Sequence, residues 1–429
     1  MSLKIIKLTP ALARLAIAAI AIICVALTWF FIKWNFANLV SSRLDRDRPE
    51  SKIVADWLTG VGPDDPQTHF AAARLFENTF EPGDVERSLS EYELAAALSP
   101  HNYLVWLELG KARDHIGDQA GSEAAFRRSL ELAPNYASVQ WAFGNSLLRH
   151  GNPDDGFALI AKAAASDPQY AGPAVSTALD MFDGDVAEAR HELGDSAQTN
   201  AAMASVLAGR GKFADAFDAW SRLGVEEKRG DLRQTGERLA GQLLVAKKYQ
   251  LAAQVTSDLL PDEAERPVIG KISNGGFEGG VKQRNAGVFE WQIAEGAEPQ
   301  IGLSESQKHS GRYSLLMSFN TYDPAAFRPI MQTVAVVPGA TYEFEAYYRS
   351  DLKTTAVFKW QVVDAAAGTV LATTDPLNNS SDWTTVKTKF TIPPSSDGVI
   401  IRFTREGCGT GACAVNGKVA FDDISVRQM

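Results

Sequence analysis

The hydrophobic positions of this 429-residue chain follow three different patterns. Residues 15–32 form an uncharged, mostly apolar run of 18 residues, which is long enough for a helix to cross a bilayer with little tilt. From about residue 50 to 262, glycines and prolines return at a fixed interval, which indicates stacked helical units. From residue 268 onward, apolar and polar residues alternate, as they do in half-buried strands. We therefore predict a multidomain chain with a transmembrane helix, an all-α solenoid and an all-β sandwich.

We expect residues 1–40 to form a cytoplasmic tail and a membrane anchor. Lys4, Lys7 and Arg14 precede the apolar run, and Lys33 and Trp34 lie at its far end, where such side chains suit a membrane interface. A cleaved signal peptide is the competing interpretation. However, the apolar segment of a signal peptide usually has about 7–15 residues, this run is longer, and no small-x-small cleavage site follows it. The basic N-terminus then predicts a single-pass inner-membrane protein with its soluble part in the periplasm.

Charge argues against one class of partner. The chain has 42 Lys and Arg against 52 Asp and Glu, a formal net charge of −10. Because the first 52 residues are basic, the part that follows is even more acidic than this total. An acidic surface repels phosphate backbones, so we expect no nucleic acid partner.

A repeat of 34 residues defines the solenoid, which we place at residues 50–262. Pro100, Pro134 and Pro168 are spaced at this interval, and two pairs of glycines keep the same spacing. It is the length of a tetratricopeptide unit, in which two helices pack and neighbouring units stack. Residues 103–134 resemble that family's pattern at Trp106, Leu109, Gly110, Gly117, Phe126 and Pro134.

The tetratricopeptide resemblance implies a groove for a protein partner, lined by the first helix of each unit. Carried over position by position, it implicates Leu104, Leu107, Lys111, Asp114, Trp141, Asn145 and Arg149. The alternative is that Trp141 packs between units and that the charged residues are merely solvated.

Alternating strands separated by turns follow a polar linker and fill residues 268–429. In "TYEFEAYYRS" (341–350), Tyr342, Phe344 and Tyr348 share one face, while Glu345 and Arg349 lie on the other. Turn sequences such as "VPGA" and "PPSSDG" separate such runs. Short alternating strands with turns at this spacing predict an antiparallel sandwich.

The same region resembles the jelly-roll carbohydrate-binding modules of the CBM4/9 type. The resemblance rests on "ISNGGFEGG", "FEWQI", "HSGRYSLLM", "SDWTTVKTKFTIP" and "VAFDDISV", which follow one another in the order typical of that family. It implies that Trp291 and Trp383 belong to the core. A sugar platform would use outward residues of the central strands, and the candidates are Glu345, Tyr347, Arg349, Lys359 and Gln361. The alternative is an ordinary solvated or protein-facing sheet.

Two further sites are expected in the sandwich. The family resemblance implies a structural calcium where the first strand meets the last, and Glu278 and Asp422 occupy the matching places with oxygen ligands. In "CGTGAC", Cys408 and Cys413 can close a small loop as a disulfide in an oxidising compartment. Two free thiols, or half of a metal site, are the alternatives.

The sequence contains no phosphate-binding, zinc-protease or nucleophile-elbow motif, so we expect no enzyme. The architecture favours a non-catalytic, membrane-tethered adaptor of the bacterial cell envelope, whose groove recruits a protein and whose sandwich binds a polysaccharide during exopolysaccharide assembly or export. The alternatives are a purely structural interaction scaffold without sugar binding and a carbohydrate-active enzyme.

Overall fold

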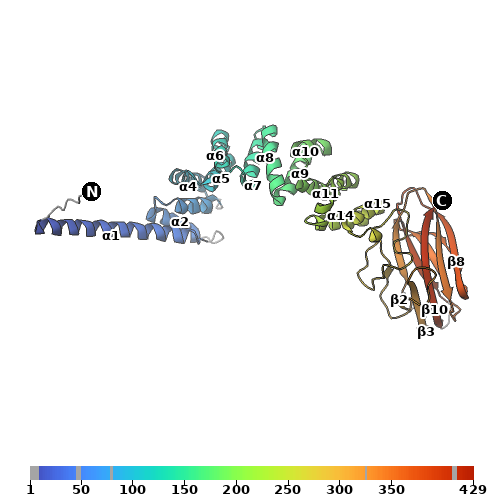
Figure 1. Ribbon diagram of the computed structural model, residues 1–429. Coiled ribbons are helices and arrows are strands. Elements are labelled where there is room, and N and C mark those ends of the chain that lie inside the picture. Colours follow the sequence, from blue (N-terminus) through green and yellow to red (C-terminus); the bar gives the residue numbers. More distant parts are fainter. Residues whose placement is uncertain (1–8, 45–49, 78–80, 324–325, 408–412) are drawn as a thin grey trace, which may run out of the picture. The chain divides into compact units, whose positions relative to one another are not determined.

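The computed structural model describes residues 9–44, 50–77, 81–323, 326–407 and 413–429. They form two compact units, Met1–Gln198 and Thr199–Met429. The first unit is helical, and the second consists of helices followed by two β-sheets (Figure 1). The expected fold class is confirmed: an apolar N-terminal helix, a tetratricopeptide-like helical region and a β-sandwich.

The helices follow one another in antiparallel pairs. Their bounds are α1 Pro10–Ser41, α2 Glu50–Val61, α3 Pro66–Glu77, α4 Asp84–Leu98, α5 Tyr103–His115, α6 Gln119–Leu132, α7 Ala137–Arg149, α8 Pro153–Ser166, α9 Pro168–Met181, α10 Val186–Leu193, α11 Ala197–Gly209, α12 Phe213–Ser221, α13 Val225–Arg229, α14 Arg233–Val245 and α15 Tyr249–Leu259, with a short 3-10 helix at Glu263–Glu265.

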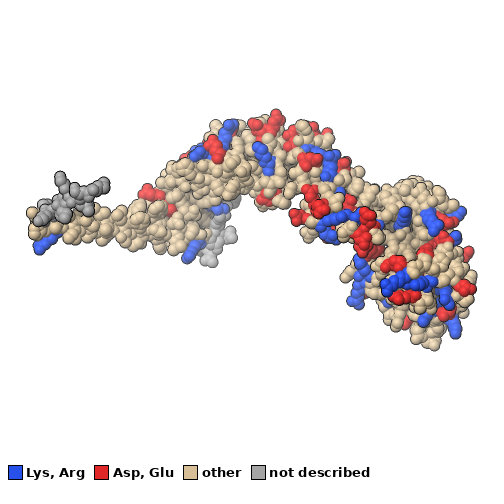
Figure 2. Space-filling model, viewed as in Figure 1, with Lys and Arg blue, Asp and Glu red and all other residues tan. Residues whose placement is uncertain are grey.

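Helix α1 is apolar on all sides. Its segment Ala13–Ser41 is long and apolar enough to cross a membrane, and large side chains such as Ile22 and Val25 are 70% exposed. Figure 2 shows little charge along the visible surface of this helix. Lys4 and Lys7, which we expected to flank the span, lie outside the described residues.

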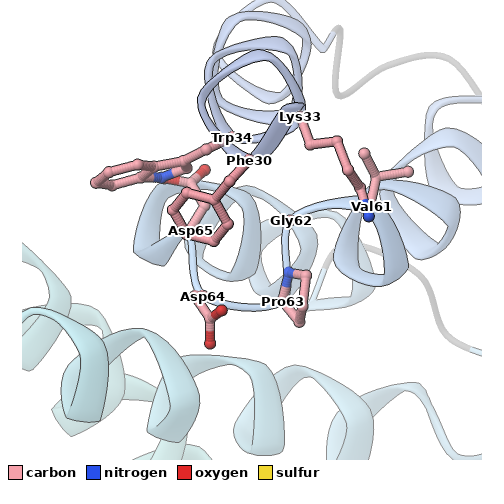
Figure 3. A pocket seen from close by; sticks show the side chains of 8 residues that line it. All are labelled: Phe30, Lys33, Trp34, Val61, Gly62, Pro63, Asp64 and Asp65. Atoms are coloured by element: carbon pink, nitrogen blue, oxygen red, sulfur yellow. The ribbon is translucent and has the colours of Figure 1, made fainter. Parts of the chain in front are cut away.

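The last turns of α1 pack on the turn between α2 and α3. Asp65 is buried there, and its Oδ1 accepts hydrogen bonds from the indole of Trp34 at 2.7 Å and from Asn38 at 3.2 Å. Ala37 lies so close to Gly62 that a Cβ on that glycine would meet the Ala37 methyl at 2.7 Å. A cavity of about 240 Å³ remains between Phe30, Trp34 and the turn (Figure 3). The end of α1 therefore packs against the hairpin formed by α2 and α3.

Local signals explain the repeated hairpins. Asn102 caps α5 and Asp118 caps α6, each by accepting a backbone N–H. Gly117 turns the chain between these helices with φ +81°, a conformation that side chains disfavour. A Cβ on Gly110 would lie 2.8 Å from the ring of Phe126, so only glycine lets the two helices approach this closely. The 34-residue spacing of these glycines thus sets the helix packing.

Two five-stranded antiparallel sheets form the sandwich. Sheet A has the strand order β1-β4-β9-β6-β7, and sheet B has the order β2-β3-β10-β5-β8. The strand bounds are β1 Gln292–Ile293, β2 Gln300–Ser304, β3 Ser314–Thr321, β4 Ile330–Ala335, β5 Thr341–Ser350, β6 Val357–Asp364, β7 Val370–Thr373, β8 Ser380–Thr391, β9 Gly398–Glu406 and β10 Val415–Gln428.

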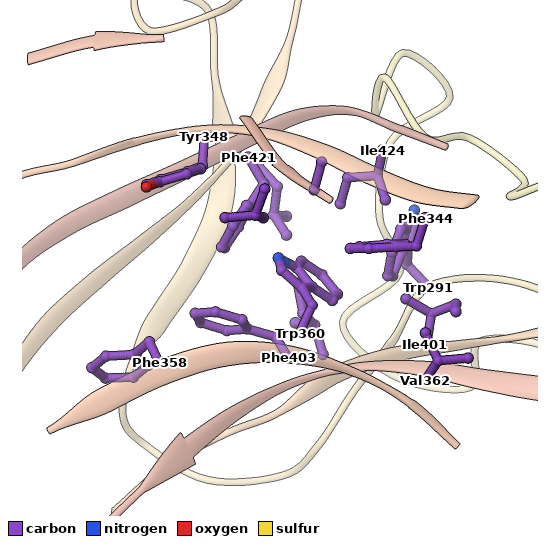
Figure 4. Close-up of a cluster of buried hydrophobic side chains, with 14 of the residues drawn as sticks. Trp291, Phe344, Tyr348, Phe358, Trp360, Val362, Ile401, Phe403, Phe421 and Ile424 are labelled. Carbon is purple, nitrogen blue, oxygen red and sulfur yellow. The ribbon is translucent and has the colours of Figure 1, made fainter. Parts of the chain in front are cut away.

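Aromatic side chains fill the space between the two sheets. Phe344 comes from sheet B, Trp360 and Phe403 come from sheet A, and all three are fully buried (Figure 4). Trp291 packs edge-on against Trp360 with ring centroids 6.0 Å apart, so its expected place in the core is confirmed. Each buried aromatic ring removes roughly 150–250 Å² from water, which makes this cluster the main source of stability in the sandwich.

"NGGFEGG" (274–280) brings the chain into the sandwich. Phe277 is fully buried in the core cluster. A Cβ on Gly275 would lie 2.0 Å from the carbonyl oxygen of Ile424 in β10, so this position can only be glycine. Gly275 therefore lets this segment pass close to the backbone of β10.

Candidate functional site

The helical groove lies over α5 and α7 in the first unit. A cavity of about 780 Å³ opens there, and five of the expected groove residues line it: Lys111, Asp114, Trp141, Asn145 and Arg149. Trp141 stacks on Tyr170 of α9 with ring centroids 5.3 Å apart, and the two rings form one aromatic wall. This wall and the charged side chains face the same space.

The polar residues of the groove hold one another in place. Asp114 accepts hydrogen bonds from Arg149 and, at 2.9 Å, from the hydroxyl of Ser146. Lys111 pairs with Glu108 at 3.0 Å. Arg149 and Lys111 are therefore each paired with an acid. The groove presents positive and negative groups side by side.

Two of the expected groove residues lie elsewhere. Leu107 is 2% exposed and belongs to a core cluster with Phe126 and Phe143, so its side chain packs between helices and does not face a partner. Leu104 is exposed but does not line the cavity. Leu107 falls on the helix face that packs against α6 and α7, which explains why the position-by-position transfer is wrong for it.

The five expected sugar-binding residues lie on two different faces of the sandwich. Glu345, Tyr347 and Arg349 belong to β5 in sheet B, whereas Lys359 and Gln361 belong to β6 in sheet A. Each set points away from the core, so the sets are on opposite outer faces. The expectation of one shared platform is therefore wrong, because β5 and β6, although adjacent in sequence, belong to different sheets.

On sheet A, the outward residues form a network of polar pairs. The side-chain oxygen of Gln361 accepts two hydrogen bonds from Arg402, at 3.0 and 2.8 Å. Lys359 pairs with Glu406 at 2.6 Å. This network includes no aromatic ring.

Sheet B carries an aromatic cluster on its outer face. The ring of His309 stacks on Tyr347 with centroids 4.0 Å apart, and it contacts Trp383 of β8 at 5.7 Å. Asp423 accepts from Nδ1 of His309 at 2.6 Å and fixes the imidazole over the tyrosine. One side of Tyr347 is thus covered, and Trp383 is half-buried at the surface.

The expected core position of Trp383 is wrong. Thr385 pairs with Tyr347 across the strands, and Trp383, two residues before Thr385, points to the same outer face. It belongs with His309 and Tyr347, and not with Trp291 and Trp360.

The two expected calcium ligands both hold one turn, at residues 309–313. Oδ2 of Asp422 accepts from the backbone N–H groups of His309 and Ser310, at 2.8 and 3.1 Å. Oε1 of Glu278 accepts from those of Arg312 and Tyr313, at 2.8 and 3.0 Å. Burial raises the pKa of Asp422 above its usual value despite these donors.

Calcium takes six to eight oxygen ligands as a rule. In the described part of the chain, no group of three or more His, Cys, Asp or Glu side chains is placed to hold a metal ion. The observed contacts assign Glu278 and Asp422 to peptide N–H groups, and a calcium at this place remains a prediction.

Cys413 is disulfide-bonded, and its pairing with Cys408 remains a prediction. Cys413 is fully buried, but Cys408 lies outside the described residues.

Sequence reasoning missed two aromatic residues of these sites. Tyr170 lies 34 residues after Tyr136, so the repeat itself is a signal for its equivalent position. His309 comes from a loop and meets Tyr347 and Asp423 only in the folded sheet. No local pattern in the sequence indicates that contact.

Comparison with known proteins finds similarities in both parts of the chain. Residues 270–408 match the model of the CBM_4_9 family, described as a carbohydrate binding domain. Among solved structures, a CBM4 module is 18% identical and covers 37% of this chain and 99% of its own, with a TM-score of 0.28. The all-helical region has the tetratricopeptide protein MamA among its neighbours; a double mutant of MamA RS-1 is 18% identical and covers 38% of this chain and 92% of its own, with a TM-score of 0.32.

One curated relative matches a short segment. It is the BBSome complex member bbs-4 of Caenorhabditis elegans, which is 29% identical over 100 residues. The match covers 23% of this chain and spans about a fifth of the relative (21%).

Proposed function

We propose that this chain is a non-catalytic, membrane-tethered adaptor that binds a saccharide through its sandwich and a protein through its helical groove. The observation that carries the proposal is the match of residues 270–408 to a carbohydrate binding domain. The site residues support it, because aromatic rings with nearby hydrogen-bonding groups are the usual means of holding a sugar ring.

Sheet B is the better candidate for the sugar face. Trp383 supplies an accessible aromatic surface, and Tyr347 and Arg349 lie next to it on the same face. On sheet A, the polar groups of Gln361, Arg402, Lys359 and Glu406 are already paired with one another. Stacking of a sugar on an indole ring contributes binding energy that paired polar groups do not.

The helical groove supports the second role. Its cavity of about 780 Å³ has one aromatic wall, Trp141 with Tyr170, and a mixed polar floor. Such a surface suits a protein segment with both apolar and polar side chains. The apolar helix α1 would tether both sites to a membrane.

Placing the protein in the bacterial cell envelope extends the proposal. An anchor that carries one protein-binding and one sugar-binding site suits assembly or export of an exopolysaccharide outside the inner membrane. This step rests on the combination of modules, and a reporter enzyme fused to the C-terminus tests it. Periplasmic activity of the reporter supports the envelope location, and cytoplasmic activity contradicts it.

Binding of purified full-length protein in detergent micelles to a panel of neutral and acidic polysaccharides tests the sugar role. Affinity electrophoresis gives a dissociation constant for each polymer. Two variants then identify the face: we expect Trp383→Ala, on sheet B, to abolish binding and Gln361→Ala, on sheet A, to leave it unchanged. The reverse result moves the site to sheet A without removing the function.

The same samples separate the alternatives. If no polymer binds, the sugar role fails and a purely structural scaffold remains. Release of new reducing ends from a bound polymer would instead indicate a carbohydrate-active enzyme.

A further inference from the structure

Three polar groups on the outer face of sheet B have no partner. In the part of the chain that the structure describes, the guanidinium of Arg349, the hydroxyl of Tyr347 and the indole N–H of Trp383 make no hydrogen bond or ion pair. His309, which lies beside them, is in contrast held by Asp423.

Cross-strand pairing brings the three groups together. Tyr347 and Arg349 are alternate residues of β5 and share its outer face. Tyr348 pairs with Thr384 and Ser350 with Ser380, so the irregular register between these pairs places residues 381–383 opposite Arg349. Trp383 therefore lies beside Arg349 on one side and close to the His309–Tyr347 stack on the other.

The neighbour of Arg349 on β10 is not acidic, whereas Glu343 and Glu345 of the same strand have basic cross-strand neighbours. Glu343 lies between Arg427 of β10 and Lys389 of β8, and Glu345 pairs with Lys387 at 2.8 Å. The neighbour of Arg349 on β10 is Ala420, which is 1% exposed and carries no charge. In a chain of net charge −10, the unpaired Arg349 guanidinium therefore lies beside the Trp383 ring.

We propose that this patch binds an acidic saccharide, meaning a sugar unit that bears a carboxylate. The inference rests on the proposed sugar binding and specifies its ligand. Trp383 stacks on the sugar ring, and the Arg349 guanidinium pairs with the carboxylate in the two-pronged geometry that fits these planar groups. The hydroxyl of Tyr347 bonds a ring hydroxyl.

Neighbouring contacts hold the patch in shape before any ligand arrives. The His309 ring covers one side of Tyr347, and Asp422 fixes the backbone of His309 and Ser310. A side chain that is already ordered loses less conformational freedom on binding. Tyr347 is therefore held in place before a ligand binds.

Matched polymers test the proposal. Full-length protein in detergent is titrated with polygalacturonate, alginate and hyaluronate, and with the methyl ester of each, which keeps the sugar backbone but removes the charge. We expect at least one acidic polymer to bind about tenfold more tightly than its ester, because a hydrogen bond to a charged group is worth about this factor. Arg349→Gln should remove that difference and leave binding of the ester unchanged.

Arg427→Gln is the control, since it removes one positive charge from the same face at a position away from Trp383. Equal weakening by both variants would overturn the proposal, because binding would then depend on overall charge. Equal binding of acids and esters would also overturn it, while sugar binding itself would stand. Binding of no polymer, in this set or in the wider panel, removes the proposed function as well.

Discussion

The backbone N–H of Tyr249 donates a hydrogen bond to Oδ1 of Asp397, 3.0 Å away, across 148 residues of sequence. Tyr249 is the first residue of α15, and the next N–H, of Gln250, donates to Oδ2 of the same carboxylate at 3.1 Å. A helix cannot satisfy these N–H groups itself, and Lys248 at the cap position offers no acceptor. Asp397, in the loop between β8 and β9, thus caps the last helix. Helix α15 and the sandwich therefore form one structural unit.

We predict that Asp397→Ala loosens α15 from the sandwich. Loss of an N-cap usually costs about 1–2 kcal/mol of stability. Hydrogen exchange of the amides in Tyr249–Leu259, followed by mass spectrometry, should become faster, because two N–H groups lose their shared acceptor.

Asp185→Ala is the matched control for this cap. Asp185 also caps a helix, α10, but it is close in sequence to the residues that it caps. It accepts from the N–H groups of Ala187 and Glu188. It should speed exchange in α10 and leave α15 unchanged. Unchanged exchange in α15 of Asp397→Ala would show that the cap does not stabilise this helix.

Gly398 is predicted to tolerate no side chain. A Cβ there would lie 2.3 Å from the ring of Tyr249, which packs over the start of β9. Gly398→Ala should lower the free energy of unfolding by about 1–3 kcal/mol in urea titrations, because the ring or the strand must move. Gly302→Ala, in β2 with no atom within 4 Å of the new methyl, should change it by less than about 0.5 kcal/mol. Equal effects of the two substitutions would contradict the packing argument.

Regular spacing made the fold class predictable. The interval of 34 residues between Pro100, Pro134 and Pro168 predicts stacked helical hairpins, and the alternation in 341–350 predicts the face that Phe344 buries. Both patterns arise from local geometry, since helices repeat every 3.6 residues and strands every two. The elements and their buried faces follow from such rules without knowledge of their neighbours.

The sites were less predictable because they depend on which strands become neighbours. Arg349 and Gln361 are twelve residues apart and both point outward, yet they belong to different sheets. Trp383 resembles a core landmark in sequence, but its pairing beside Tyr347 turns it outward. The cap of α15 by Asp397 has no local signal in either segment. Each of these contacts joins distant parts of the chain. The alternation of apolar and polar residues in a strand shows which face is buried, but it does not show which strand lies beside it.

Gly110 offers a test of the tetratricopeptide packing. Its missing Cβ leaves room for the ring of Phe126, which would otherwise be 2.8 Å away. We predict that Gly110→Ala lowers the free energy of unfolding of the helical region by about 1–3 kcal/mol in urea titrations, because α5 and α6 must separate. Gly241→Ala in α14 has open space around it and should stabilise its helix by up to about 1 kcal/mol. A stabilising effect at Gly110 would contradict the close approach.

His69 and Glu91 form a buried pair in the first unit. Nδ1 of His69 lies 2.5 Å from Oε2 of Glu91, and Nε2 lies 2.8 Å from the carbonyl oxygen of Pro63. Burial disfavours the charged imidazolium, but the hydrogen bonds to Glu91 and Pro63 outweigh it and raise the pKa of His69 above its ordinary value. The pKa of Glu91 is lowered, because its bonds to His69 and Arg87 outweigh its own burial.

These shifts predict how stability depends on pH. A group with a raised folded pKa stabilises the fold fully below its unfolded value, about 6.5 for histidine, and this contribution is lost as pH rises through the folded pKa. The lowered pKa of Glu91 acts at acidic pH. Its contribution to stability is lost only as the pH falls through that pKa. Urea midpoints of the helical region should therefore fall as the pH rises above about 6.5 in the unmodified protein.

His69→Gln should flatten this fall, because glutamine keeps a hydrogen bond to Glu91 but carries no titrating proton. It should also cost about 1–3 kcal/mol near pH 6, where the charged pair contributes most. His101→Gln is the control, since His101 is exposed at the start of the next hairpin and makes no contact of this kind within the described residues. If the midpoints of His69→Gln and His101→Gln fall with pH as steeply as those of the unmodified protein, the buried pair is not the source of the pH dependence.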